Sequence, residues 1–184
     1  MDRPNLGVYK LADDVPDLKV ATRDSVCFDI PIYIKSGGSC KAYNGYNKEK
    51  SLSGLWDHSI IGNFEQLTLS PYIEIPPLWR GCLRTGIILD IPRGYSVRIY
   101  TRSSTPLKRG LMLANSVGII DSDYVDELLL MFVNISNTMV RVEHGDRLAQ
   151  GELLETPDEY FIHTRSIKPT QKTDRNGGFG STGK

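Results

Sequence analysis

Short apolar runs alternate with turn-forming residues along most of the chain. The runs are rich in Val, Ile, Leu and aromatic residues, and Gly, Pro, Asn and Asp separate them. Few windows hold a period of 3.6 residues for long, so the pattern predicts β-strands rather than helices. The predicted strands are 26–35, 66–75, 86–90, 96–101, 128–134, 138–142 and 148–152. The sequences IPRG at 91–94 and EHGD at 143–146 supply the turns of a β-sandwich or barrel.

Two segments depart from this strand pattern. A helix is predicted near 105–110, and Pro106 keeps it short. Residues 36–65 hold many glycines among Tyr, Asn and Lys without strong periodicity, which indicates an insertion between two strands. One interpretation is a surface excursion without a specific role, since loops tolerate insertion at little cost. The other is an arm that contacts a partner or subunit, because the segment also contains Tyr43, Tyr46, Trp56 and Phe64.

Composition sets the class of protein. A chain of 184 residues suits one domain, 1–184, with a sizeable core. The 22 basic residues equal the 22 acidic ones, so no global charge favours nucleic acid or an anionic membrane, and we expect neither as a partner. Three cysteines without CxxC spacing fit a reducing compartment, and no apolar run is long enough to cross a membrane. These features predict a cytoplasmic protein.

Four polar motifs could carry chemistry. Carboxylates gather at 121–127, directly before an apolar strand, and this spacing predicts the turn of a hairpin. The sequences RSS at 102–104, NSVG at 115–118 and GDRLAQ at 145–150 accompany them. Together they offer phosphate donors, including Arg102 and Arg147, and a carboxylate able to act as a general base. These groups are the ones needed to catalyse attack on a nucleotide phosphate.

The C-terminal stretch RNGGFGSTGK, at 175–184, completes this set. Its glycine backbones can approach an anion closely, and its hydroxyl groups are donors. Phe179 could lie flat over a base or sugar. Composition alone favours a disordered linker. Together with the other motifs, however, the stretch predicts a flexible C-terminal arm at about 170–184 that orders when a ligand binds.

The order RSS, NSVGIIDSDY, GDRLAQ, GGFGSTG closely resembles the trimeric dUTPases, which hydrolyse deoxyuridine triphosphate. The resemblance runs from about residue 76 to residue 184 and more weakly back to Asp29. It implies an all-β, distorted jelly-roll (β-clip) barrel that forms a homotrimer. It also implies three active sites shared between subunits, with each C-terminal tail closing over a neighbour's site. The implied reaction converts dUTP to dUMP and pyrophosphate with Mg²⁺.

The resemblance assigns roles to residues of the central motifs. Asp121 would orient and deprotonate the water that attacks the α-phosphorus, and Tyr124 would pack against the deoxyribose. Asn115 and Gly118 would read the uracil edge. The positions that would face the phosphates are Arg102, Ser103 and Gln150, with Arg102 helping to hold either the subunit junction or the phosphates.

The resemblance also assigns roles to Asp29, in the first motif, and to the C-terminal tail, in the last. Asp29 would help to hold a hydrated Mg²⁺, a hard cation that keeps most of its water. Val26 and Cys27 stand where the family usually has a small pair of residues. The tail residues that would contact the nucleotide are Arg175, Phe179, Gly180, Ser181 and Thr182. Arg175 lies one residue closer to Phe179 than is usual in the family.

Two other functions remain open at this point. The related dCTP deaminases would use a glutamate in the strand after the 121–127 turn, where this chain has Met131. A protein that uses the dUTPase scaffold to bind or regulate a macromolecule through 36–65 is the second alternative. That segment would suit a divergent branch of the family, such as a viral one acting in the host cytoplasm.

Overall fold

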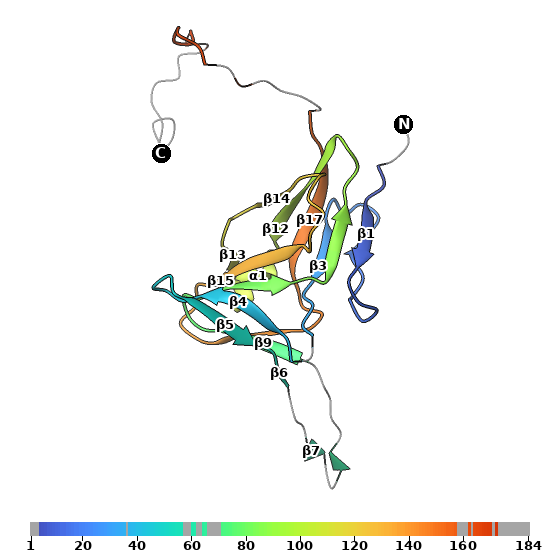
Figure 1. Ribbon diagram of the computed structural model, residues 1–184, viewed down its shortest axis with the longest axis vertical. Coiled ribbons are helices and arrows are strands. Elements are labelled where there is room, and N and C mark those ends of the chain that lie inside the picture. Colours follow the sequence, from blue (N-terminus) through green and yellow to red (C-terminus); the bar gives the residue numbers. More distant parts are fainter. Residues whose placement is uncertain are drawn as a thin grey trace.

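Two five-stranded antiparallel sheets form the body of the protein (Figure 1). The computed structural model describes residues 4–35, 37–56, 60–61, 64–65, 71–157, 162, 164–170 and 172. The first sheet has the order β14-β12-β17-β3-β2, formed by Gly118–Ile120, Tyr95–Thr101, Arg147–Glu155, Phe28–Pro31 and Lys19–Val20. The second has the order β13-β15-β10-β4-β5, formed by Leu111–Leu113, Leu129–Asn134, Arg80–Arg84, Ser39–Tyr43 and Glu49–Ser53.

Smaller antiparallel ladders flank these sheets. They are β16-β9-β6 (Val140–Glu143, Pro71–Ile75, Leu55–Trp56), β1-β11 (Gly7–Lys10, Ile87–Asp90) and β7-β8 (Ile60–Ile61, Phe64–Glu65). Helix α1, Ser104–Arg109, ends at Gly110, whose φ of 64° suits a glycine. Within the described ranges, no helix has the length and apolar character needed to cross a membrane. The predictions of an all-β fold and of one short helix near 105–110 are confirmed.

The core forms because alternate side chains of the strands face inward. In β15, Leu130 and Phe132 are 2% and 0% exposed, whereas Leu129 and Met131 face outward at 46% and 41%. Each large apolar side chain buried in this way contributes about 1.5–3 kcal/mol. Other fully buried side chains include Ile30, Ile32, Ile75, Leu83, Ile87, Val97, Ile99, Leu111, Leu128 and Leu148.

Each predicted strand overlaps an observed one, but several observed strands were missed. Strand β10 reads RGCLR, and only Leu83 is a large apolar residue there. Strands β4 and β5 lie inside the supposed insertion and pair with each other, and β4 also joins β10. Only the small residues Cys40 and Ala42 of β4 are buried, so the alternation was present but weak. Part of the segment 36–65, namely β4 and β5, therefore belongs to the second sheet.

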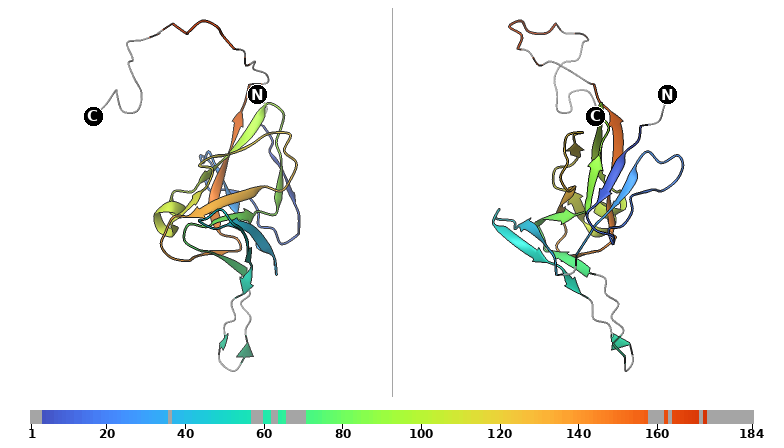
Figure 2. Two further views of the ribbon diagram at one scale, coloured as in Figure 1. Left: turned by 60° about the vertical axis from the view of Figure 1, so that its left-hand side comes forward. Right: turned by 45° about the vertical axis from the view of Figure 1, so that its right-hand side comes forward.

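A projecting hairpin follows these strands in the chain. After β6, which pairs with β9, Ile60 pairs with Glu65 and Ile61 with Phe64 in the β7–β8 ladder. Figures 1 and 2 show this ladder at one end of the molecule, well away from both large sheets. We call residues 57–70, which include β7 and β8, the arm.

The turn predicted at 121–127 is real, but it is not the turn of a paired hairpin. Tyr124 N–H donates to the Asp121 carbonyl at 3.2 Å, which closes the turn. The strands on either side then pair with different partners, β14 with β12 and β15 with β13 and β10. The segment thus crosses from the first sheet to the second, and the hairpin prediction is wrong.

Candidate functional site

A buried carboxylate lies between two arginines at one end of β12. Asp29, on β3, is only 6% exposed. Its Oδ1 pairs with Arg102 Nη1 at 2.8 Å and its Oδ2 with Arg147 Nη1 at 2.9 Å. Burial of a carboxylate is costly unless it is paired, which explains why both oxygens are engaged. One carboxylate with two guanidinium groups leaves net positive charge, so this cluster can attract an anion.

A β-bulge directs Arg147 toward Asp29. In the β17–β3 ladder, Ala149 pairs with Ile30 but Arg147 pairs with Pro31, so Leu148 is the extra residue. Leu148 and Ala149 are consecutive buried residues at 1% and 0% exposure, whereas regular strand residues alternate. Without the bulge, Arg147 would face inward. Bulges commonly re-aim side chains beside functional sites.

The same bulge anchors the segment that carries Arg102 and Ser103. The Leu148 carbonyl accepts hydrogen bonds from Arg102 N–H at 3.1 Å and from the Thr105 hydroxyl at 3.0 Å. Ser103 occupies the N-cap position of α1, is exposed, and makes no side-chain capping hydrogen bond. Its hydroxyl is therefore available to a ligand. Gln150 lies directly opposite Asp29 in the ladder, so the structure brings these predicted phosphate-facing residues together.

Asn115 and Gly118 line a small cavity beside β14. Its volume is about 80 Å³, and Ile99, Leu113 and Met131 also contribute to its wall. A Cβ atom at Gly118 would lie 3.2 Å from Ile99 Cβ, so the glycine lets β14 approach β12 closely without crowding Ile99. The cavity is far smaller than ordinary ligand pockets of roughly 300–1,000 Å³. This cavity alone therefore encloses only part of a nucleotide-sized ligand.

Asp121 and Tyr124 lie in the exposed 121–127 turn. Asp121 follows β14 directly, and Tyr124 is 39% exposed. The Tyr124 hydroxyl donates to the Glu127 carbonyl at 3.0 Å, which orients the ring. Burial, with help from Asp126, raises the pKa of Tyr124, so the phenol keeps the proton that it donates. The loop thus presents a carboxylate beside an oriented aromatic ring.

These two groups of residues lie at opposite ends of β12. Ile120 pairs with Val97, which places Asp121 near the start of that strand. Arg102 lies past the other end, about 20 Å away at roughly 3.3 Å per residue. A bound nucleotide cannot place one phosphorus next to both residues of one chain. The predicted general base and the predicted phosphate-facing residues are therefore separated within a chain.

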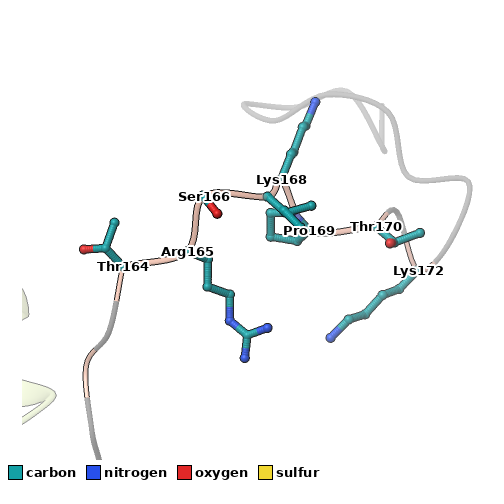
Figure 3. Close-up of a pocket in the computed structure, with 8 residues that line it drawn as sticks. Thr164, Arg165, Ser166, Lys168, Pro169, Thr170 and Lys172 are labelled. Carbon is teal, nitrogen blue, oxygen red and sulfur yellow. The ribbon is translucent and has the colours of Figure 1, made fainter.

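The predicted tail contacts, Arg175, Phe179, Gly180, Ser181 and Thr182, lie outside the described residues. The described part of the tail bends near Ser166 beside an open space of about 810 Å³ (Figure 3). Arg165, Lys168 and Lys172 line it together with neutral residues, and no body residue contributes. We regard it as a bend of a basic segment rather than a built site.

One polar pair escaped the sequence interpretation. The Tyr100 hydroxyl donates to Glu152 Oε2 at 3.0 Å, and Tyr100 lies opposite Gln150 in the β12–β17 ladder. Spacing by two residues places Gln150 and Glu152 on one face of β17. That spacing was the available signal, and it extends the polar surface next to Asp29.

Comparisons with known proteins give a consistent answer. The family model described as dUTPase matches residues 66–183. The deoxyuridine 5'-triphosphate nucleotidohydrolase of Finegoldia magna is 39% identical over 138 residues, which is 73% of this chain and 94% of that protein.

Solved structures agree at the level of the fold. A crystal structure of dUTPase from Streptococcus mutans matches with a TM-score of 0.58 at 21% identity, over 86% of this chain and 99% of that one. A variant of the Staphylococcus bacteriophage 80alpha dUTPase with dUpNHpp matches with a TM-score of 0.66 at 15% identity, over 97% and 98% of the two chains. The jelly-roll prediction is thereby confirmed.

Proposed function

Since the chain belongs to the dUTPase family, we propose that it is a dUTP diphosphatase that hydrolyses dUTP to dUMP and pyrophosphate. The buried Asp29 held by Arg102 and Arg147 is the observation that carries this proposal, because it forms a prebuilt cationic site for a polyphosphate. Deamination of dCTP is not favoured, since Met131 stands where a deaminase would need a glutamate.

Each part of the site has a role in this reaction. Asp121 orients the attacking water and accepts its proton, and proximity compensates for the weak basicity of a carboxylate. Arg102, Ser103 and Gln150 hold the phosphates. Asn115 and Gly118 contact the base largely through backbone groups. Tyr124 packs against the deoxyribose, where a 2'-hydroxyl would clash.

Asp29 fits a hydrated cation better than a directly bound one. Its Oδ2 accepts a guanidinium N–H of Arg147 and its Oδ1 forms an ion pair with Arg102, and a carboxylate has about four acceptor sites, so about two remain for water. No group of three or more His, Cys, Asp or Glu side chains among the described residues could hold a metal. Mg²⁺ held mainly by the triphosphate would neutralise its charge and polarise the α-phosphorus. The structure of a point mutant of the phage phi11 dUTPase of S. aureus reveals the coordination of a structural Mg(II) ion.

The separation along β12 supports a homotrimer with shared sites. Asp121 of one subunit would then act on a triphosphate held by Arg102 of another, while a C-terminal tail closes the site. Arg175, Phe179, Gly180, Ser181 and Thr182 are the tail residues that we propose for this contact.

Mixed oligomers test this arrangement directly. Asp121→Asn and Arg102→Gln proteins, each nearly inactive alone, are unfolded together, refolded, and assayed for pyrophosphate release. In a random mixture of a cyclic oligomer, about a quarter of the sites receive both intact residues from neighbouring chains. Recovery of about a quarter of the parent activity is expected. If the mixture stays as inactive as its components although mixed oligomers form, the shared site is wrong.

The arm favours an additional binding role. Its β7–β8 ladder lies apart from both sheets (Figure 2), and a phage phi11 dUTPase structure is described as showing a species-specific insert. We propose that the arm contacts a protein partner. Replacement of 57–70 by a short Gly-Ser turn should leave dUTP turnover unchanged; loss of turnover with an intact oligomer would instead place the arm in the active site.

The three free cysteines, Cys27, Cys40 and Cys82, fit a reducing compartment. We therefore propose a cytoplasmic location, which would be the host cytoplasm for a viral chain.

A further inference from the structure

We propose that Arg147 is a positioning residue that serves as the reserve counter-ion of Asp29 and thereby leaves Arg102 able to engage the triphosphate. This inference rests on the proposed function, in which Arg102 contacts phosphate. Arg147 itself acts through Asp29 and need not touch the nucleotide.

The burial of Asp29 creates the need for a second arginine. A 6% exposed carboxylate that loses its only partner is strongly destabilised, because it remains charged in a poorly solvated place. If Arg102 were that only partner, its movement toward a phosphate would leave Asp29 unpaired. With Arg147 Nη1 held 2.9 Å from Oδ2, Asp29 stays paired while Arg102 shifts.

The two arginines also differ in their surroundings. The Arg102 side chain is 27% exposed and its backbone is bound to the Leu148 carbonyl, next to the available Ser103 hydroxyl. The Arg147 side chain is 53% exposed and comes from the bulged strand. Arg102 therefore lies among the other phosphate-facing groups, whereas the bulge places Arg147 on the carboxylate.

A double-mutant cycle separates this role from a direct phosphate contact. Arg147→Met keeps the aliphatic bulk and removes the charge, and Asp29→Asn removes the carboxylate that needs a partner. Binding of the imido analogue dUpNHpp is measured by calorimetry on the full-length oligomer, once with Mg²⁺ and once in EDTA. EDTA removes the cation, so in that series Asp29 cannot affect binding by holding Mg²⁺.

Arg147→Met should weaken analogue binding in EDTA by about 10- to 100-fold, because Arg102 must stay with Asp29. Adding Asp29→Asn to Arg147→Met should restore most of that loss. If the double variant binds as weakly as Arg147→Met, Arg147 contacts the phosphates directly and the inference is overturned. If Arg147→Met binds like the parent, Asp29 needs no reserve partner and the inference also fails.

Two further variants distinguish a failure of this inference from a failure of the proposed role of Arg102. Arg102→Gln should weaken binding in every background; if it does not, the proposed role of Arg102 is wrong, whatever Arg147 does. Arg109→Met is the matched control, since Arg109 is 29% exposed and pairs with Asp146 at 2.7 Å outside the phosphate-facing group. It should change thermal stability without changing the affinity for dUpNHpp.

Discussion

The arginine end of β12 and the carboxylate end differ in how far a single chain completes them. At the arginine end, Asp29 is buried, both of its oxygens are paired, and the adjoining backbone is fixed by the Leu148 carbonyl. At the carboxylate end, Asp121 is exposed in a turn that crosses between the sheets.

The difference shows which functional group depends on assembly. Charges that bind a polyanion can be preorganised inside one chain, because carboxylate and guanidinium groups neutralise one another during folding. A general base needs to remain available and to be desolvated only when substrate is present. We infer that a neighbouring subunit and the tail supply this desolvation at the carboxylate end.

The largest expected effect comes from Asp121→Asn. Removal of the base should lower kcat by about 10²- to 10⁴-fold, while dUpNHpp binding and the melting temperature stay close to those of the parent, because the side chain is exposed. Pyrophosphate release, calorimetry and thermal unfolding check the three quantities. Full turnover in this variant would remove Asp121 from its proposed role.

Deletion of residues 177–184 tests whether the tail covers the carboxylate end of β12. Without a closing segment, the carboxylate and the nucleotide remain hydrated, and turnover should fall by about 100-fold. The oligomeric state, measured by light scattering, should persist. A truncated protein that dissociates would show that the tail holds the subunits together rather than closing the site.

Gly151→Ala probes the scaffold of the arginine end. A Cβ atom there would lie 2.4 Å from the Cζ atom of Phe28, which pairs with Gly151 across β17 and β3. The forced shift should lower the free energy of unfolding by about 1–3 kcal/mol in denaturant titrations. Gly81→Ala is the control, because its nearest neighbours would be 3.6 Å away, an ordinary contact. Equal losses in both variants would mean that crowding against Phe28 is not the cause.

Tyr124→Phe should produce the smallest effect. It removes one exposed hydrogen bond to the Glu127 carbonyl, so stability should fall by no more than about 1 kcal/mol. Packing against the sugar uses the ring face and should be retained, so the preference for dUTP over UTP, measured as a ratio of kcat/KM, should persist. Loss of that preference would show that the hydroxyl itself excludes the ribose.

The sequence predicted the strands of both sheets best where large apolar residues alternate, as in β12 and β15. It missed β4 and β10, because Cys40, Ala42 and Gly81 are buried without being strongly hydrophobic. Local pattern cannot say which sheet a strand joins, since pairing depends on contacts between distant segments, and the hairpin at 121–127 was wrong for this reason.

The candidate site shows the same limit. Motif order pointed to Asp29, Arg102 and Gln150 separately, and the structure places Asp29 beside each of the other two. The pairing of Asp29 with Arg147 follows from the extra residue in β17, which alternation along a regular strand cannot reveal. The tail assignments stay predictions.

The bulge at Leu148 also determines where the chain can change in length. Loss of one residue there would restore regular alternation and displace the carbonyl that binds Arg102 and Thr105. A deletion of the same size in the arm would shorten only a ladder that stands apart from both sheets. Relatives that diverge by insertion and deletion should therefore vary freely in the arm while keeping a constant residue count between the arginine and the glutamine of GDRLAQ.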